Sequence, residues 1–112
     1  EIVYGLRNFI GNANKFSKSK VFINVKSDSN NTEIIIEDDG EGYPKDVLSK
    51  IGEPYIKSFK SSTRSKSGLG LGIFIGKTLL EKNYANILCK NSKTRSGAEV
   101  SIKWKNKDLL SL

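Results

Sequence analysis

The sequence contains no histidine and no methionine, and it has one cysteine and two prolines in 112 residues. Without histidine the chain lacks the usual general base, the commonest metal ligand and any phosphohistidine acceptor, so histidine-dependent triads and zinc sites are excluded. Cys89 cannot form an internal disulfide, which fits a reducing compartment, and its apolar neighbours place it in a strand interior. No apolar run approaches the length of a membrane span.

The chain also begins without a signal-peptide pattern or an initiator methionine, so we expect it to be part of a longer protein with any targeting information upstream. Its length predicts a single domain. The net charge of +7 is compatible with a nucleic-acid or anionic-membrane partner. The lysines are scattered rather than clustered, however, and we interpret the charge as solubility plus a polyphosphate ligand.

Hydrophobic periodicity predicts the elements of this domain. Apolar residues recur every three or four positions over residues 2–16 and 70–82, which indicates two helices with one buried face each, the second ended by a left-handed Asn83. Residues 44–51 form a shorter helix with proline in its first turn. Strands paired as two hairpins are expected at residues 21–26, 32–37, 85–90 and 98–104. The tail after Lys105 is expected to be frayed.

Two glycine-rich turns enclose a polar, basic segment. Residues 38–42 (DDGEG) follow an apolar strand, and residues 68–72 (GLGLG) lead into the second long helix. Glycine lets the main chain approach a ligand closely, and the free N–H groups at a helix start attract phosphate. Residues 53–67 lack apolar periodicity, so we expect a lid that is disordered without ligand. A ligand that carries phosphate is therefore predicted.

Four polar residues are candidates for the chemistry. Asn8 and Asn12 lie four residues apart in the first helix and Lys15 follows three later, so all three side chains can reach one ligand. Amide oxygens suit Mg²⁺, which prefers hard oxygen ligands, although a solvated polar face is the alternative. Asp38 is either a turn or capping residue or a partly buried carboxylate. As a buried carboxylate it would accept a hydrogen bond from an exocyclic amine and distinguish adenine from guanine.

Together these motifs resemble the ATP-binding catalytic domain of bacterial sensor histidine kinases, in the gyrase, chaperone, kinase and MutL (GHKL) ATPase superfamily. The boxes of that domain correspond to residues 8–16 (asparagine), 38–42 (first glycine), 53–55 (aromatic), 68–72 (second glycine) and 97–100 (last glycine-containing). The sequence of residues 52–55, 71–75 and 78–81 most resembles that of the RegB/PrrB redox-sensing branch.

The resemblance implies a fold and domain limits. The fold is α/β (α+β), a two-layer sandwich of the Bergerat type with a mixed sheet and helices on one face. The domain would occupy residues 1–105, truncated at its amino end, where the family normally adds a strand. Residues 106–112 would be a tail.

The resemblance implies roles around the metal and phosphates. Asn12 would coordinate Mg²⁺ with assistance from Asn8, Lys15 would meet the phosphates, and Phe16 would line the nucleotide. Members that hydrolyse ATP carry a glutamate base four residues before the magnesium asparagine, and that position here is Asn8. The resemblance therefore favours phosphoryl transfer over hydrolysis.

It also implies roles for the glycine boxes and the lid. Asp38 would read the adenine amine in a pocket shaped by Gly40 and Gly42. The second box would hold the phosphates through Gly68, Leu69, Gly70 and Leu71. Tyr55 would anchor the lid at the nucleotide, and developing charge would be neutralised by one of Lys57, Lys60 and Arg64.

Two departures from the family's pattern bear on these roles. Ala98 replaces the hydroxyl residue common in the last box, which removes support for a water-mediated adenine contact. Residues 83–85 (NYA) replace the usual histidine-glycine-glycine turn.

The resulting expectation is a domain that binds ATP and Mg²⁺ and transfers the γ-phosphate to a histidine on a separate phosphoacceptor and dimerisation domain upstream in the same protein. Alone it is inactive, because it lacks the acceptor. The resemblance further implies a response-regulator receiver domain as partner, a homodimeric full-length protein, and a cytoplasmic domain whose parent protein is anchored in the bacterial inner membrane. The signal that the parent protein senses is not implied.

Three alternatives stay open. One keeps the fold but makes the acceptor a protein serine, as in anti-sigma factor kinases, and another is a non-catalytic ATP-binding module. The third is a basic nucleic-acid-binding module with Tyr55 and Phe59 as stacking platforms. That third hypothesis leaves the paired glycine boxes unexplained, so no nucleic-acid partner is expected.

Overall fold

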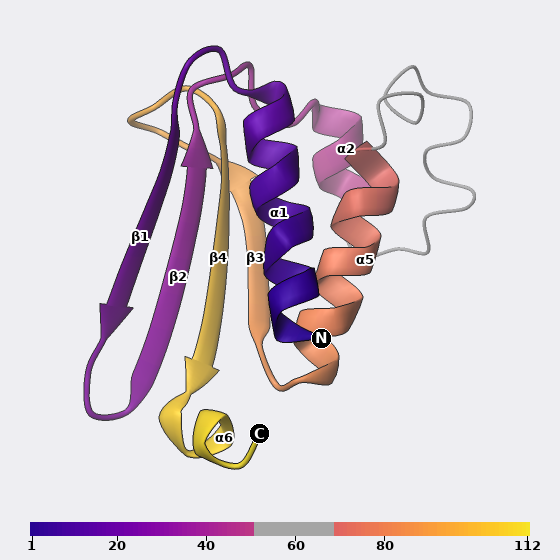
Figure 1. Ribbon diagram of the computed structural model, residues 1–112. Helices are drawn as coiled ribbons and strands as arrows, with labels where there is room; N and C mark the ends of the chain where they lie inside the picture. Colours follow the sequence, from indigo (N-terminus) through magenta and orange to yellow (C-terminus); the bar gives the residue numbers. More distant parts are fainter. Residues whose placement is uncertain (51–68) are drawn as a thin grey trace.

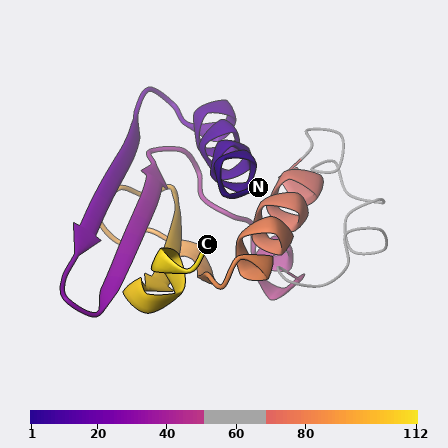
Figure 2. The same ribbon diagram turned by 60° about the horizontal axis from the view of Figure 1, so that its bottom comes forward.

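The computed structural model describes residues 1–50 and 69–112 as two layers, a sheet and a set of helices on one of its faces (Figures 1 and 2). The elements, in chain order, are α1 (Ile2–Phe16), β1 (Val21–Ser27), β2 (Asn31–Asp38), α2 (Lys45–Lys50), α5 (Leu69–Lys82), β3 (Asn86–Asn91), β4 (Ala98–Lys105) and α6 (Asn106–Leu110). The predicted two-layer sandwich is confirmed. The predicted lid, residues 53–67, lies outside the described residues. Within the described ranges, no helix is both long enough and apolar enough to cross a membrane.

The sheet has the strand order β1-β2-β4-β3, and all three pairings are antiparallel. The two predicted hairpins, β1–β2 and β3–β4, are confirmed. The expectation of a mixed sheet is wrong for the strands described. β2 and β3 run in the same direction, but β4 lies between them, so no two neighbouring strands are parallel.

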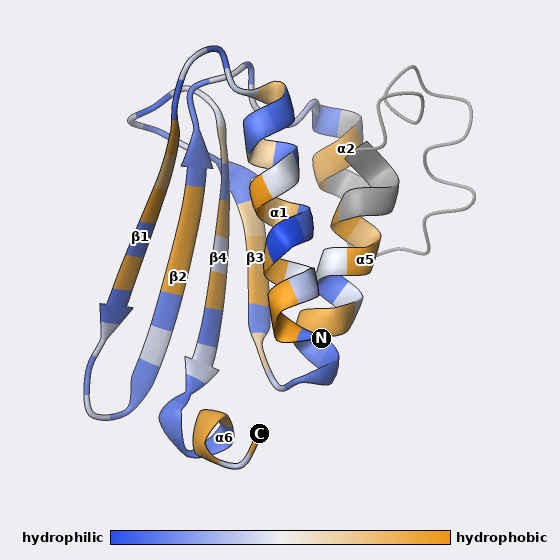
Figure 3. Ribbon diagram, viewed as in Figure 1, coloured by the Kyte–Doolittle hydropathy of each residue, from blue (hydrophilic) through white to orange (hydrophobic). Residues whose placement is uncertain are grey.

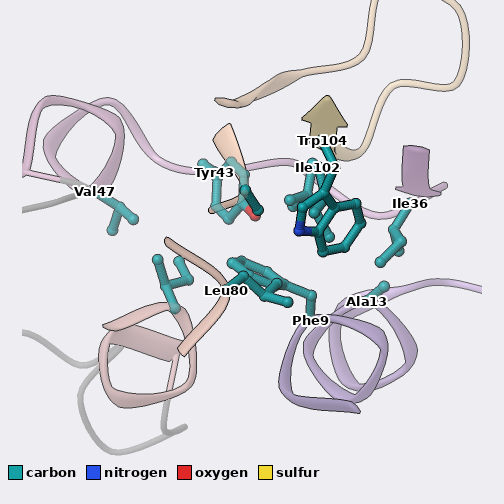
Figure 4. Packing of buried hydrophobic residues seen from close by; sticks show 11 residues of the cluster. Phe9, Ala13, Ile36, Tyr43, Val47, Leu80, Ile102 and Trp104 are labelled. Atoms are coloured by element: carbon teal, nitrogen blue, oxygen red, sulfur yellow. The ribbon is translucent and has the colours of Figure 1, made fainter. Parts of the chain in front are cut away.

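The core lies between the sheet and the helices. Because alternate residues of a strand point to one face, β4 buries Val100, Ile102 and Trp104 against the helices. Ile36 of β2 pairs with Val100 in register and is also buried. Figure 3 shows hydrophobic residues recurring along α1 and along the strands behind it, and Figure 4 shows the side chains that meet there.

The helices α1 and α5 pack closely because of a glycine. Phe9 of α1 and Leu80 of α5 are 1% and 0% exposed. A Cβ added at Gly76 would lie 2.8 Å from Cε2 of Phe9 and 3.2 Å from the carbonyl oxygen of Gly5. The crossing therefore has no room for a side chain at position 76.

The end of α5 differs from the prediction. Tyr84, not Asn83, is left-handed, with a φ of 73°. The N–H of Ala85 donates to the carbonyl of Leu80 at 3.0 Å, so the helix closes in a Schellman-type turn. Asn83 is used differently, because its Nδ2 donates to the carbonyl of Leu79 at 2.9 Å. The side chain of Asn83 thus satisfies a carbonyl of the helix, and the left-handed conformation occurs at the next residue, Tyr84.

The expectation of a frayed tail is also wrong, because residues after Lys105 form the short helix α6. Asn106 attaches this helix to the β1–β2 turn. Its N–H donates to the carbonyl of Asn30 at 2.8 Å and its Nδ2 to the carbonyl of Asp28 at 2.7 Å, while its Oδ1 accepts from Thr32 at 2.7 Å. These three bonds hold the start of the segment against the sheet.

The helix crossing can be tested with two alanine substitutions. Gly76→Ala should lower the free energy of unfolding by about 1–3 kcal/mol, because the methyl group must displace the buried ring of Phe9. Gly11→Ala, on α1 with nothing within 4 Å of the added Cβ, should raise it by about 0.5–1 kcal/mol through helix propensity. Urea unfolding of both variants measures the contrast, and equal shifts would contradict the crossing.

Candidate functional site

A cavity of about 420 Å³ opens between the carboxyl-terminal half of α1, the end of β2 and the start of β4. The sequence predicted six of its lining residues, which are Asn12, Lys15, Phe16, Asp38, Gly40 and Gly42. Tyr43, Pro44, Ala98 and Val100 complete much of the apolar wall. The asparagine box, the first glycine box and the last box therefore meet at one site.

Asp38 is the buried carboxylate of this cavity, with only 3% of its surface exposed. Its Oδ1 accepts hydrogen bonds from the N–H of Gly40 at 2.8 Å and of Ala98 at 3.3 Å. Both bonds go to the same oxygen, so within the described part of the chain Oδ2 is the atom left for a ligand donor. The site can therefore recognise a ligand N–H group through a fixed acceptor.

Glycine is required around Asp38 by close approach. A Cβ at Gly97 would overlap the main chain of Asp38, and a Cβ at Gly40 would overlap the carbonyl oxygen of Phe16. Gly42 is left-handed, with a φ of 82°, a conformation that other residues adopt at a cost in strain. The main chain at the end of β2 is thus packed between α1 and the β3–β4 turn.

Asn12 has a side-chain amide whose hydrogen bonds are not satisfied by the described residues. Its Nδ2 is buried and has no hydrogen-bond partner among the described residues. An unpaired buried amide costs about 1–3 kcal/mol, which a ligand in the cavity can relieve. Rotation of the amide by 180° places the oxygen in the same position, where it is able to ligate Mg²⁺.

The described residues hold no cluster of three histidine, cysteine or carboxylate side chains that would bind a metal alone. A metal at Asn12 would therefore take its remaining ligands from phosphate oxygens and water, as Mg²⁺ commonly does. The donor set fits a magnesium ion that arrives with a phosphorylated ligand.

The structure does not bring every predicted residue to the cavity. Asn8 is not among the lining residues, and its Nδ2 donates to the carbonyl of Tyr4 at 2.9 Å within α1. Lys15 lines the cavity, with its Nζ 5.7 Å from the centre of the Phe16 ring.

The second glycine box is described only in part. Leu69, Gly70 and Leu71 form the first turn of α5, which begins at the same end of the domain as the end of β2 (Figure 1). The end of β2 lines the cavity. The predicted residues Tyr55, Lys57, Lys60, Arg64 and Gly68 lie outside the described residues.

Asp39 does not line the cavity but holds two of its walls together, a role that the sequence analysis missed. Its carboxylate accepts from the N–H groups of Lys18 at 2.8 Å, Ser19 at 3.0 Å and Lys20 at 3.2 Å, and from the hydroxyl of Ser19 at 2.8 Å. These bonds, those from Ser19 above all, hold the pKa of Asp39 well below its usual range. They attach the end of α1, with Phe16, to the end of β2. Strand alternation is the pattern that could have indicated Asp39, because consecutive residues of a strand point to opposite faces and Asp39 directly follows Asp38.

Tyr43 was missed as well. Its side chain is 7% exposed and forms part of the core, and burial raises the pKa of its phenol well above the usual value, with Cys89 and Asp38 nearby adding to the effect. Burial also raises the pKa of the Cys89 thiol to about 11, although a hydrogen bond from Tyr43 opposes the shift. Both groups are neutral at pH 7, so Tyr43 adds no charge to the cavity that it lines.

The chain is similar to known proteins. A family model described as "Histidine kinase-, DNA gyrase B-, and HSP90-like ATPase" matches residues 2–108. Sensor histidine kinase RegB of Cereibacter sphaeroides is 35% identical to this chain in an alignment that covers 93% of this chain and 26% of RegB. Sensor protein SrrB of Staphylococcus aureus is 34% identical over 88 residues, which cover 77% of this chain and 15% of SrrB. The chain thus spans about a quarter or less of these relatives.

Solved structures share the fold. The mycobacterial sensor histidine kinase MprB superposes with a TM-score of 0.69 at 23% identity, covering 91% of this chain and 70% of that one. Full-length ShkA, solved in complex with AMPPNP, superposes with a TM-score of 0.66 at 24% identity, covering 90% of this chain and 20% of that one. The predicted likeness to RegB is confirmed by the sequence similarity, and the Bergerat-type fold by the family match.

The role of Asp39 predicts a pH dependence. A carboxylate whose pKa is lower in the folded state stabilises the fold above its unfolded pKa, about 3.9, and loses this effect as pH falls through the folded value. Asp39→Asn should therefore have a lower free energy of unfolding than the wild type at pH 7. The difference should shrink progressively below about pH 4.

Chemical denaturation at several pH values measures this difference. Glu41→Gln is the control, because Glu41 is an exposed carboxylate of the same turn that accepts no hydrogen bond from residues 18–20. A difference between wild type and Asp39→Asn that stays constant from pH 7 to pH 2 would contradict the anchoring role.

Proposed function

The chain is a catalytic ATP-binding domain of the sensor histidine kinase type, a member of the histidine kinase-, DNA gyrase B- and HSP90-like ATPase family, and we propose that it binds ATP with Mg²⁺ and transfers the γ-phosphate to a histidine on a separate domain. The observation that supports this most directly is the meeting of Asp38, Asn12 and Lys15 in one cavity. A buried acceptor and an amide without a partner among the described residues are the two groups that a magnesium nucleotide would satisfy.

The base would bind at Asp38. Adenine has an exocyclic amine that can donate to the free carboxylate oxygen, whereas guanine presents a carbonyl oxygen at the same position. Two acceptors that face each other in a buried site leave both without a partner, which discriminates strongly against guanine. Phe16 lines the same cavity and offers an aromatic face to the base.

The phosphates would bind toward Asn12 and Lys15. Asn12 would hold the Mg²⁺ ion, which neutralises the phosphate oxygens when bound. Lys15 adds a positive charge on the same side of α1. The amino end of α5, which carries Leu69, Gly70 and Leu71, would donate N–H groups to the phosphates. The roles predicted for Gly68 and for one of Lys57, Lys60 and Arg64 belong to the same end of the nucleotide, whereas Tyr55 would anchor the lid.

Transfer is favoured over hydrolysis. A glutamate that activates water would occupy position 8, where this chain has a neutral amide that already donates to Tyr4. With no base at position 8 to activate water, the domain would contribute positioning and electrostatic stabilisation to phosphoryl transfer. Asn8 would at most assist the metal from outside the lining of the cavity.

The rest of the reaction would lie in the whole protein. The chain contains no histidine, so the acceptor would belong to an upstream phosphoacceptor and dimerisation domain. A receiver domain of a response regulator would take the phosphoryl group next. The parent protein would be a homodimer anchored in the bacterial inner membrane, with this domain in the cytoplasm.

Nucleotide binding can be tested by calorimetry with a non-hydrolysable ATP analogue and its GTP counterpart. The wild-type chain should bind the adenine analogue in preference, and more tightly with Mg²⁺ than without. Asp38→Asn should weaken adenine binding by about ten- to a hundredfold, because it turns an ionised acceptor into an amide. Asn12→Ala should remove the gain in affinity that Mg²⁺ provides.

Matched controls are Asp108→Asn on α6 and Asn14→Ala on the exposed face of α1, which should both bind as the wild type does. Equal affinity for the adenine and guanine analogues in a folded wild-type sample would contradict the role of Asp38. Unchanged magnesium dependence in Asn12→Ala would contradict the metal role.

Phosphoryl transfer can be tested with ATP labelled in the γ-phosphate and a separately produced acceptor domain. The chain alone should stay unlabelled, and the acceptor should gain an acid-labile phosphohistidine. Asn12→Ala should lower the rate by at least about a hundredfold, since the metal stabilises the charge that is transferred. An acid-stable product on serine would instead support the serine-kinase alternative.

A further inference from the structure

Asn91 binds the main chain of Tyr43 at both polar groups. The N–H of Tyr43 donates to Oδ1 of Asn91 at 2.6 Å, and Nδ2 of Asn91 donates to the carbonyl oxygen of Tyr43 at 3.1 Å. A carboxamide holds an acceptor oxygen and a donor NH₂ group in one plane, so it can pair with the N–H and C=O of one residue as a neighbouring strand does. Asn91 is the last residue of β3, an edge strand of the described sheet. Its side chain therefore acts as a short extension of the sheet onto residue 43.

The segment that Asn91 holds is a wall of the cavity. Gly42 and Tyr43 both line it. A Cβ at Gly42 would lie 2.7 Å from Oδ1 of Asn91, so the carboxamide also lies against Gly42. At the other end of the same turn, the N–H of Gly40 is bound to Asp38. The turn between residues 38 and 43 is thus attached at both ends, at its start to the buried Asp38 and at its end to the exposed Asn91.

We propose that Asn91 is a positioning residue for the base of the bound nucleotide. It would keep residues 42 and 43 at the distance from Phe16 and Asp38 that admits a purine ring. The role depends on the proposed ATP binding, and it acts at the base end of the cavity and not at the phosphates. Asn91 itself does not line the cavity.

The chemistry explains why asparagine is needed. Aspartate has the same shape but no donor, and its charge would lie against the carbonyl oxygen of Tyr43. Alanine removes both bonds. The Asn91 residue is exposed, so water can take the place of the lost partners and the fold should survive either change. What should change is how firmly the turn is held before the base arrives.

The test compares Asn91→Ala and Asn91→Asp with wild type and with Asn86→Ala. Asn86 is an exposed residue at the start of the same strand, so its substitution is a matched control. Calorimetry measures the affinity for the non-hydrolysable ATP analogue and for ADP, each with and without Mg²⁺. Both Asn91 variants should bind both nucleotides about five- to tenfold more weakly. The ratio of affinities with and without Mg²⁺ should stay at its wild-type value, because the metal end is untouched.

Hydrogen exchange provides a second measurement that does not depend on the ligand. The amide of Tyr43 should exchange slowly in the wild type and in Asn86→Ala, and quickly in Asn91→Ala. Far-ultraviolet circular dichroism should show the same fold for all four proteins.

The outcomes are distinct. If the wild type binds ADP and the analogue, but both Asn91 variants bind within twofold of it, the positioning role is overturned while the proposed function stands. A loss confined to measurements with Mg²⁺ overturns it as well, since the effect would lie at the phosphates. A folded wild-type chain that binds neither nucleotide overturns the proposed function and this role together.

Discussion

The site depends on one buried carboxylate. Asp38 ends β2 inside the domain, where an acceptor without donors would be strongly unfavourable. The N–H groups of Gly40 and Ala98 satisfy one of its oxygens, and this requires the first turn after β2 and the start of β4 to lie against it. Gly97 is needed because the main chain of β4 enters so close to Asp38. The strand order, with β4 next to β2, is therefore part of the binding site.

A large part of this arrangement could be predicted from local patterns. Helical periodicity predicted α1 to its observed limits, Ile2–Phe16, because its buried face is continuous. Asp38, Asn12 and Phe16 were predicted from their motifs, and the structure brings them to one cavity. The strand pairings within each hairpin follow from short turns. The hairpins are joined by the placement of β4 between β2 and β3, which no local pattern encodes. The mixed sheet was expected from the resemblance alone, and it is wrong for the strands described.

The residues that were missed act over long separations or through competing local bonds. Asn91 and Tyr43 are 48 residues apart, and neither position has a pattern that indicates the other. Asp39 binds a segment about twenty residues earlier, mainly through main-chain N–H groups, which carry no sequence signal of their own. At the end of α5, Asn83 was the better candidate for a left-handed residue by propensity, but its side chain binds the helix instead. Tertiary context decided each of these cases.

The two ends of the cavity differ in how complete they are before a ligand binds. At the proposed base end, Asp38, Asp39 and Tyr43 are held by bonds between the end of β2, the turn after α1 and the edge of β3. At the phosphate end, the amide of Asn12 is buried without a partner among the described residues. A rigid wall lowers the entropy that binding must overcome, whereas an unsatisfied group gains a bond only from the ligand. In the proposed complex, the base end would therefore orient the nucleotide, and the nucleotide and its metal would complete the phosphate end.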